Sequence, residues 1–423
     1  MLGVRRIGAA ALGLIVIFAL GGASTRQRAE ALDNGLARTP PMGWNGFNHF
    51  GRDVTASIVE AEARVIVSSG MKAAGYSYVN LDGGWDLLQR DAAGELQPDR
   101  SKFPDGIKPV ADYVHSLGLK FGIYTSIGTE NCAGTSAGSY GRYQQDADTF
   151  ASWGVDYVKV DWCYVPLQNY PDLTQTQVAE MLGAQMRDAL AGTGRPMVFD
   201  YNVNRLCPDD CSVWTWGPGV ANLWRTAPDM KDRYTVMVRN FTANVPFYAY
   251  AGPGGWNDPD MLEVGNGGMT DTEYRSEFSL WAVMAAPLLA GNDLTTMSAA
   301  TRQIITNRDV IAVDQDPLGK QAYPVASADG LWVLSKPLAN GDRAVVLFNQ
   351  SATPAIITTS ATQVGLRAAP AYTLRNLWQH GTTETTGMIS ANVPPHAALM
   401  YRVAARGRLG GGAGDPAAPE GAS

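Results

Sequence analysis

Histidine and cysteine are scarce in this sequence, which has only four of each among 423 residues. No paired C-x-x-C spacing and no H-E-x-x-H motif occurs, so zinc is rejected and we predict that the protein holds no metal. Basic residues form no stripe and the net charge is −7, which argues against nucleic acid as a partner. The apolar fraction of 45% is typical of globular proteins and excludes wholesale disorder.

Long hydrophobic runs are also missing, except near the N-terminus. Two arginines precede an apolar run over residues 7–20, and Ala29-Glu30-Ala31 offers a cleavage site, so residues 1–31 are predicted to be a signal peptide. The run is short for a membrane span, although a retained N-terminal anchor is the alternative. We therefore expect a secreted protein, extracellular or periplasmic, with no stable membrane association after signal removal.

Export would allow disulfide bonds to form. An even number of cysteines permits two bridges. Cys207 and Cys211 are neighbours in "CPDDC", which favours a local Cys207–Cys211 bridge and leaves Cys132 to pair with Cys163.

Short apolar runs alternate with helical patterns over residues 32–317. This repeat of strand and helix predicts an α/β protein built on a (β/α)8 TIM barrel. A doubly wound sheet is the alternative, but it would require a Gly-rich phosphate turn after its first strand, and "GWNGF" does not fit that motif. The predicted strands lie at 40–47, 76–85, 120–126, 155–163, 196–202, 220–227, 248–256 and 286–293, and clear helical patterns lie at 57–75, 106–118 and 272–286.

Residues 318–403 predict a small antiparallel β-sandwich domain. Five short β-type runs, at 331–338, 343–351, 355–360, 371–378 and 397–403, are separated by Gly, Asn and Pro turns. A carbohydrate-binding module is the alternative, but exposed aromatics beyond Trp332 and Trp378 are few, which favours a packing role. Residues 404–423 are expected to be a disordered tail. The sequence leaves the oligomeric state open.

Polar and aromatic residues recur at the ends of the predicted barrel strands. Active sites of TIM barrels lie at the C-terminal ends of the strands, so these side chains are expected to converge on one mouth. The residues concerned are Trp44, Asp82, Tyr124, Asp161, Asp200 with Asn202, and Arg225 with Asp229.

Lys159 and Asp161 stand two residues apart in "YVKVDWCY", inside a strand that otherwise has the composition of a buried one. Side chains at i and i+2 point to the same face, so both are expected at the barrel mouth. The lysine should lower the pKa of Asp161, and a carboxylate kept ionised in a partly dry pocket is a candidate nucleophile. A structural ion pair that fills the barrel is an equally good interpretation of these residues alone.

Asp229 follows Arg225 by four residues in "LWRTAPDM", at the start of a helical stretch, and taken alone it is better interpreted as a helix N-cap. Together with Asp161, however, it supplies the two carboxyl groups that glycoside hydrolysis needs. The G-x-S-x-G motif at 134–138 would favour a serine hydrolase, but a loop precedes it where that motif requires a strand.

Several motifs occur together and in order: "TPPMGWNGF", "YVNLDGGW", "FGIYTSIGTENCAG", "WGVDYVKVDWC", "LWRTAPDM" and "GPGGWNDPDML". They resemble the α-galactosidase family, glycoside hydrolase family 27 of clan D, from about residue 36 to 294. The resemblance implies a TIM barrel with a β-domain behind it, and retaining, double-displacement hydrolysis of a carbohydrate without any cofactor. It implies that Asp161 is the nucleophile and Asp229 the acid/base, and that the sugar subsite is lined by Trp44, Asp82, Tyr124, Lys159 and Arg225.

The resemblance also implies a Cys132–Cys163 bridge beside that subsite and a mainly structural role for Asp260. Two positions depart from the family pattern. Gly83 stands where the family usually has a second aspartate, and Asn202 stands where a glutamate helps to bind the 2-position of the sugar. These departures leave open another sugar, such as a β-L-arabinopyranoside or a dextran-type α-glucan, and a sugar-binding protein that has lost catalysis.

Overall fold

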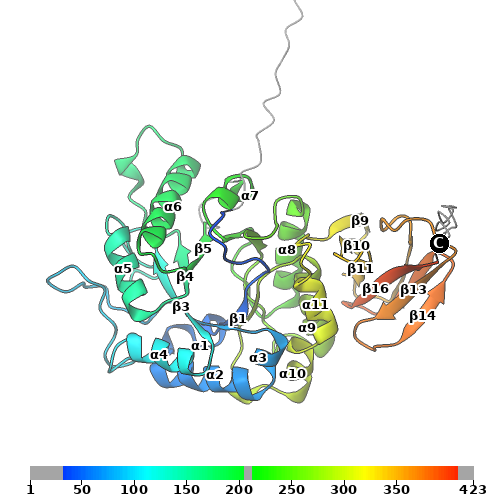
Figure 1. Cartoon of the computed structure of the whole chain (residues 1–423), viewed down its shortest axis with the longest axis horizontal. Coiled ribbons are helices and arrows are strands. Elements are labelled where there is room, and N and C mark those ends of the chain that lie inside the picture. The colour runs from blue at the N-terminus through cyan, green and yellow to red at the C-terminus, as the bar shows by residue number, and fades with distance from the viewer. Residues whose placement is uncertain (1–31, 204–211, 408–423) are drawn as a thin grey trace, which may run out of the picture.

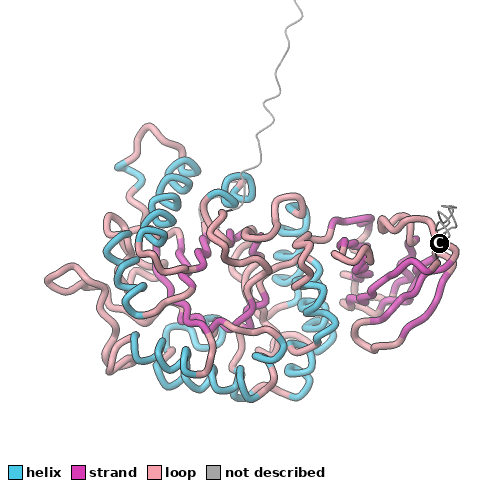
Figure 2. The backbone as a smooth tube through the Cα atoms, in the orientation of Figure 1, coloured by secondary structure: helices cyan, strands magenta, loops and turns pink. Residues whose placement is uncertain are grey.

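The computed structural model describes residues 32–203 and 212–407. Its first part is an eight-stranded parallel sheet that curls around a common axis, with helices outside it (Figures 1 and 2). The second part is an antiparallel β domain that lies beside the barrel. The predicted class, a TIM barrel followed by a β-sandwich, is confirmed.

The barrel strands are arranged in the order β7-β6-β5-β4-β3-β2-β1-β8, so neighbours in space are also neighbours in sequence, except that the last strand, β8, pairs with the first, β1. Leu262, just beyond β7, closes the ring because it exchanges backbone hydrogen bonds with Leu289 and Gly291 at β8. The strands are β1 (Met42–Asn45), β2 (Tyr78–Leu81), β3 (Lys120–Ser126), β4 (Tyr157–Asp161), β5 (Val198–Asn202), β6 (Leu223–Arg225), β7 (Trp256–Asp258) and β8 (Leu288–Ala290).

Helices bury one face against the sheet. Short 3₁₀ turns lie at Gly51–Asp53, Leu167–Asn169, Gly217–Gly219, Val245–Phe247 and Leu294–Thr296. The helices are α1 (Phe47–Phe50), α2 (Ala56–Ser68), α3 (Met71–Ala74), α4 (Lys108–Ser116), α5 (Tyr143–Trp153), α6 (Gln175–Gly192), α7 (Val213–Trp216), α8 (Tyr234–Asn244), α9 (Asp271–Val283), α10 (Ala299–Ile305) and α11 (Arg308–Asp314).

Local sequence explains where the α9 helix begins. The Thr270 hydroxyl accepts a hydrogen bond from the Glu273 amide, while the Glu273 carboxylate accepts from the Thr270 amide at 2.7 Å. Such a capping box satisfies amides that the first turn leaves without partners, and an N-cap contributes about 0.5–2 kcal/mol. The cap sets the start of the helix against which the C-terminal domain packs.

Two predicted elements differ from the structure for reasons of backbone geometry. The helix predicted at 57–75 divides into α2 and α3 at Gly70, whose φ of 92° is left-handed and ends a right-handed helix. The strand predicted at 248–256 was placed too early: the glycine-rich segment forms a tight turn between Gly252 and Gly255, and β7 begins only at Trp256.

The C-terminal domain pairs a six-stranded sheet, in the order β14-β13-β16-β11-β10-β9, with a two-stranded β12-β15 ribbon. The sequence analysis missed β9, β14 and β15. No residue of β9 or β14 is fully buried, and β15 buries only Ile389 and Val393. The strands are β9 (Tyr323–Ala328), β10 (Leu331–Pro337), β11 (Arg343–Asn349), β12 (Ala355–Ser360), β13 (Ala371–Asn376), β14 (Thr382–Thr385), β15 (Met388–Val393) and β16 (Ala398–Arg406).

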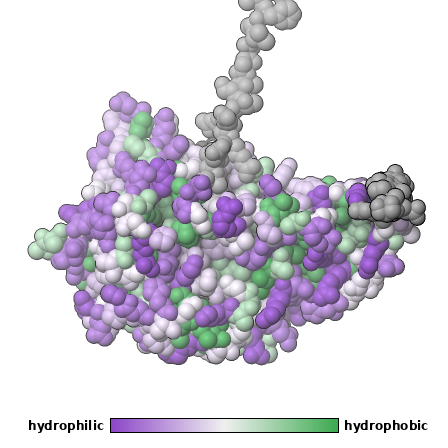
Figure 3. Space-filling view, in the orientation of Figure 1, coloured by the Kyte–Doolittle hydropathy of each residue, from purple (hydrophilic) through white to green (hydrophobic). Residues whose placement is uncertain are grey.

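Both tryptophans of this domain pack against the barrel core. The Trp378 indole donates to the Ser279 hydroxyl of α9 at 2.9 Å, and Trp332 meets Phe241 of α8 edge to face. These contacts agree with the expected packing role. The face of the molecule in Figure 3 is mainly hydrophilic, and none of the helices in the described ranges is both long and apolar enough to span a bilayer.

Candidate active site

One cavity of about 210 Å³ lies at the C-terminal ends of the barrel strands. The register of the sheet places Ser126, Asp161 and Asn202 at the same level on three adjacent strands, so their side chains meet at one height. Seven of the eight predicted catalytic and sugar-binding residues line this cavity: Asp82, Tyr124, Lys159, Asp161, Asn202, Arg225 and Asp229.

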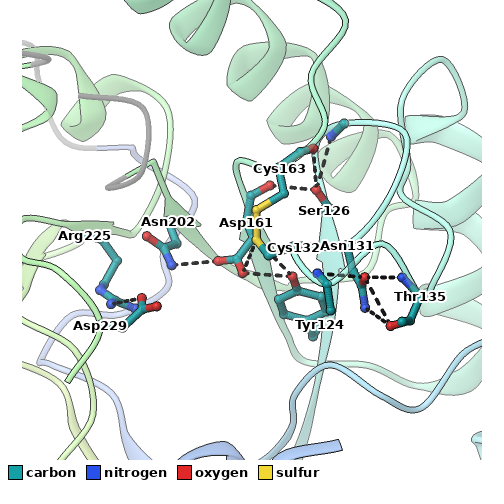
Figure 4. Close-up of a disulfide and its surroundings, with 12 residues drawn as sticks. Tyr124, Ser126, Asn131, Cys132, Thr135, Asp161, Cys163, Asn202, Arg225 and Asp229 are labelled. Atoms are coloured by element: carbon teal, nitrogen blue, oxygen red, sulfur yellow. Dashed lines mark hydrogen bonds and ion pairs between the residues drawn. A yellow bond between two sulfur atoms is a disulfide. The ribbon is translucent and has the colours of Figure 1, made fainter. Parts of the chain in front are cut away.

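Asp161, at the end of β4, is held by donors on both carboxylate oxygens (Figure 4). The Asn202 amide donates to Oδ1 at 2.7 Å, and the Tyr124 hydroxyl donates to Oδ2 at 2.8 Å. These bonds orient the carboxylate from two neighbouring strands. Burial nevertheless raises the pKa of Asp161, and the opposing effect of Lys159 does not outweigh it. Lys159 does lower this pKa, as expected, but burial raises it by more, so the net shift is upward.

Lys159 makes its direct ion pair with Asp82 and not with Asp161. Its Nζ lies 2.7 Å from Asp82 Oδ2, which also accepts from the Asn45 amide at 2.7 Å. Burial alone would lower the pKa of Lys159, but the negative charges of Asp82 and Asp161 raise it above its ordinary value. The cavity therefore contains a permanent cation beside the nucleophile candidate, and the simple Lys159–Asp161 pair predicted as the alternative is not formed.

Asp229 lies on the loop between β6 and α8, on the side of the cavity that Asp161 faces (Figure 4). Arg225 donates to its Oδ1 at 3.1 Å, and half of its side-chain surface remains exposed. The N-cap residue of α8 is Arg233, so Asp229 does not cap this helix. The carboxyl group is thus presented to the opening, where a leaving group would enter.

Asp260 holds the loop that carries Asp229. Its Oδ2 accepts from the Met230 amide at 2.6 Å, and its Oδ1 lies 3.0 Å from the Arg225 guanidinium. Its own backbone has a φ of 85°, a left-handed conformation uncommon for a side-chain-bearing residue. These contacts agree with the structural role expected of Asp260, although it also lines the cavity.

A Cys132–Cys163 disulfide borders the cavity, as predicted. The Cys132 sulfur lies 3.3 Å from Asp161 Oδ2, and it makes a contact without donating a hydrogen because it carries none. Cys132, Cys163 and Asp161 are also grouped closely enough to suggest a metal site. Two of these three groups are sulfurs bonded to each other, so they cannot bind a metal as thiolates. The predicted Cys207–Cys211 bridge lies outside the described residues.

Trp44 is the predicted site residue that the cavity does not include. Its side chain is fully buried, and its indole donates to the Asn292 carbonyl at 2.8 Å. It therefore supports the floor of the barrel mouth in this structure without facing the opening. Residues that the sequence analysis did not identify also line the cavity, including Asn48, Arg52 and Asn131. Asn48, in "GWNGFNHF", follows the first strand, which was the available signal.

Gly83 lines the cavity, and because it has no side chain it leaves room in the cavity wall. A Cβ atom added there would lie 3.4 Å from the Tyr124 ring, which is ordinary contact. The neighbouring Asp82 is turned toward Asn45 and Lys159.

The serine of the G-x-S-x-G motif is buried away from the cavity. Ser136 is 2% exposed and donates to the Asp86 carbonyl, so it is not available as a nucleophile.

This geometry can be compared with known proteins. Residues 39–316 match the family described as alpha galactosidase A, and residues 328–403 match its C-terminal beta sandwich domain. The chain belongs to the α-galactosidase family. An α-galactosidase from Cyamopsis tetragonoloba is 43% identical over 385 residues, which cover 88% of each chain. It follows that the protein is a glycoside hydrolase and that its substrate is a carbohydrate.

Solved structures of this family have the same fold. Alpha-galactosidase I from Mortierella vinacea is 34% identical with a TM-score of 0.83, and the match covers 88% of this chain and 99% of that one. A β-L-arabinopyranosidase from Geobacillus stearothermophilus is 26% identical with a TM-score of 0.78, and the match covers 90% and 99% of the two chains. Members with this architecture therefore differ in the sugar they accept.

Proposed function

We propose that the protein is an exported, retaining α-galactosidase that removes terminal α-D-galactosyl residues from oligosaccharides or polysaccharides. The observation that supports this mechanism is the pair of carboxyl groups on one cavity. Asp161 is immobilised by two hydrogen bonds beside a cation, whereas Asp229 is half exposed at the opening. The two environments suit two different roles, because a nucleophile must be held in place and an acid/base must reach the leaving oxygen and then water.

In the first step, an oxygen of Asp161 forms a bond to the anomeric carbon while the glycosidic C–O bond breaks. Asp229 gives its proton to the leaving oxygen, and a covalent glycosyl-enzyme remains. In the second step, Asp229 takes a proton from water, whose oxygen attacks the anomeric carbon and releases Asp161. Two inversions give overall retention, and no cofactor enters either step. Lys159, Asp82 and Arg225, which line the same cavity, hold ring hydroxyls in this proposal.

A second sugar is favoured by one feature of the cavity. Gly83 offers no side chain beside the ring subsite, so a β-L-arabinopyranoside, which has the ring pattern of galactose without its 6-carbon, would lose nothing there. A relative of this fold is named for that activity. The same catalytic pair would hydrolyse either substrate.

Export is the remaining part of the proposal, and it is supported by the signal-like composition of residues 1–31. It is tested by expressing the full chain in a secreting host and sequencing the N-terminus of the protein found outside the cytoplasm. Only full-length protein, retained in the cell, would contradict it.

The mechanism is tested by following the anomeric protons of the first-formed product by NMR. A panel of nitrophenyl substrates would contain the α-galactoside, β-L-arabinopyranoside, α-N-acetylgalactosaminide and α-glucoside. We expect rapid hydrolysis of the α-galactoside with α-galactose formed first. Initial β-galactose would overturn the retaining mechanism, while activity only on the arabinoside would keep the mechanism and change the substrate.

A further inference from the structure

A second cavity lies between the two domains, away from the catalytic residues. Its volume is about 690 Å³, more than three times that of the catalytic cavity, and it lies within the range of about 300–1,000 Å³ typical of ligand sites. Its walls come from the start of α9, the α10–α11 connection, the β13–β14 turn and the β15–β16 turn. We call this space the interdomain groove.

Hydrogen bonds across the domain boundary hold the walls of the interdomain groove in place. The Asp309 carboxylate bonds both Arg375 and His380 at 2.8 Å, and the Asn307 amide donates to the Leu377 carbonyl at 3.0 Å. On the opposite wall, Ser276 bonds the His396 carbonyl at 2.7 Å. A site whose walls are already ordered loses little entropy when it binds a ligand.

The groove is cationic within an acidic protein. Three arginines line it, Arg275, Arg308 and Arg375, whereas Asp309 is its single lining carboxylate. Arg275 and Arg308 are exposed, and within the described ranges neither guanidinium forms an ion pair or a hydrogen bond. The chain as a whole carries a net charge of −7, so this concentration of positive charge is local.

The chemistry of the lining indicates a ligand that is both anionic and polyhydroxylated. A guanidinium presents a planar set of donors that matches a carboxylate, and such charge-assisted bonds are stronger than neutral ones. The exposed side-chain amides of Gln303 and Gln379, which also line the groove, offer both donors and acceptors to hydroxyls. The Trp378 ring, partly exposed in the wall, adds a flat surface for a sugar ring.

We propose that the interdomain groove binds a carboxylated saccharide, a uronic-acid segment of the polymer whose neutral galactosyl branches the barrel removes. Arg275 and Arg308 bind the carboxylates, and Trp378 packs on a sugar ring. The site would hold the enzyme on an acidic polysaccharide independently of the catalytic cavity. This inference rests on the proposed function for its choice of polymer.

The test measures binding of the purified full-length protein to a uronic-acid hexasaccharide by isothermal titration calorimetry. Comparison ligands are a neutral hexasaccharide of galactose, inorganic sulfate and poly-glutamate. The variants are the double variant Arg275→Ala/Arg308→Ala and the matched control Arg302→Ala, an exposed arginine of α10 that does not line the groove. Thermal unfolding shows whether each variant is folded.

We expect the uronic-acid hexasaccharide to bind the wild type, and the double variant to weaken its dissociation constant by about 10-fold or more, as loss of charge-assisted bonds implies. Arg302→Ala should bind as the wild type does, and the neutral hexasaccharide should bind at least 10-fold more weakly, by the same reasoning. Equal binding of poly-glutamate or sulfate would show an anion site without saccharide recognition and would overturn the proposal. The proposal would also be overturned if the uronic-acid hexasaccharide did not bind, or if the double variant bound it as tightly as the wild type.

Failure of the proposed function is distinguishable from failure of this site. Hydrolysis of nitrophenyl α-galactoside is measured on the same wild-type preparation. An inactive wild type that still binds the uronic-acid ligand through Arg275 and Arg308 would remove the assigned activity and keep the groove. An active wild type that does not bind the uronic-acid ligand would keep the assigned activity and remove the groove as a binding site.

Discussion

Lys159 forms its ion pair at the barrel mouth with Asp82, with Nζ 2.7 Å from Oδ2, although Asp161 stands only two residues from Lys159 in the chain. Asp161 is thereby free to take its hydrogen bonds from Tyr124 and Asn202. Asp82 is the carboxylate in direct contact with Lys159, while the carboxylate of Asp161 remains available for chemistry. The predictions below follow from this division of partners.

Replacing Asp161 by asparagine should abolish turnover while the fold remains. The isosteric amide can still meet Tyr124 and Asn202, but it cannot form the glycosyl ester, so kcat should fall by about 10⁴-fold or more, as for other nucleophile deletions. Steady-state rates and circular dichroism test this together. Substantial activity in a folded Asp161→Asn variant would remove the assignment of the nucleophile.

The Asp229→Asn variant should lose activity in a way that depends on the leaving group. A nitrophenolate with a low pKa needs little protonation, so its glycosylation step should be slowed much less than that of an unactivated disaccharide, while deglycosylation is slowed for both. Exogenous azide should restore turnover of the activated substrate. Asp172→Asn, a change at an exposed carboxylate elsewhere, is the control. An equal loss with both substrates would contradict the acid/base role.

Removing the Tyr124 hydroxyl should move the acidic limb of the pH profile. Its hydrogen bond to the charged form of Asp161 lowers that carboxyl's pKa and partly offsets the larger effect of burial. In Tyr124→Phe the pKa of Asp161 therefore rises further, and kcat/KM should begin to fall at a higher pH than in the wild type. Tyr140→Phe, which removes a hydroxyl bonded to Tyr170, should leave the limb in place. A shift toward lower pH in Tyr124→Phe would refute this account.

Gly83→Asp should change the preference between sugars. The added Cβ has ordinary contact with the Tyr124 ring, and the new carboxylate would enter the cavity beside the ring subsite. If it reaches a galactose hydroxyl, a bond to a charged group should raise kcat/KM for the α-galactoside relative to the β-L-arabinopyranoside by about 10-fold. Gly83→Ala separates the effect of volume from that of charge. An unchanged ratio in Gly83→Asp would show that this position does not contact the sugar.

Protein stability should fall as the pH rises through neutrality, in part because of Glu62. Burial raises the pKa of this carboxyl from 4.5 to about 8, while its bond from the Leu294 amide opposes the rise. Between those pH values the folded protein keeps a proton that the unfolded chain has released. The free energy of unfolding must therefore decrease over that window. The Glu62→Gln variant should show a smaller decrease, measured by denaturant titration at pH 5 and pH 8.

The matched control for this prediction is Glu60→Gln, on the same helix but only partly buried. It should follow the pH dependence of the wild type. A wild-type stability that increases from pH 5 to pH 8, with Glu62→Gln unchanged from it, would show that the buried carboxyl does not behave as described.

The sequence alone determined the class of fold and most of the residues that meet at the site, because these depend on local pattern. Alternation of strand and helix predicts a barrel, and a polar residue at the end of a strand such as β4 must face the mouth. Family motifs then indicated the roles of Asp161 and Asp229. The boundaries of β7 were missed because glycines permit several backbone paths, and only packing selects among them.

What the tertiary structure decided was which charges and surfaces meet. Lys159 could pair with either Asp82 or Asp161 by sequence, and strand register together with burial selects Asp82. Trp44 has the kind of aromatic side chain that can pack against a sugar ring, but its surroundings bury it completely. The interdomain groove joins residues more than 100 positions apart, Arg275 and Trp378 among them, and their proximity depends on how two domains pack. Side-chain partners at long sequence separation follow from three-dimensional packing, which no local pattern records.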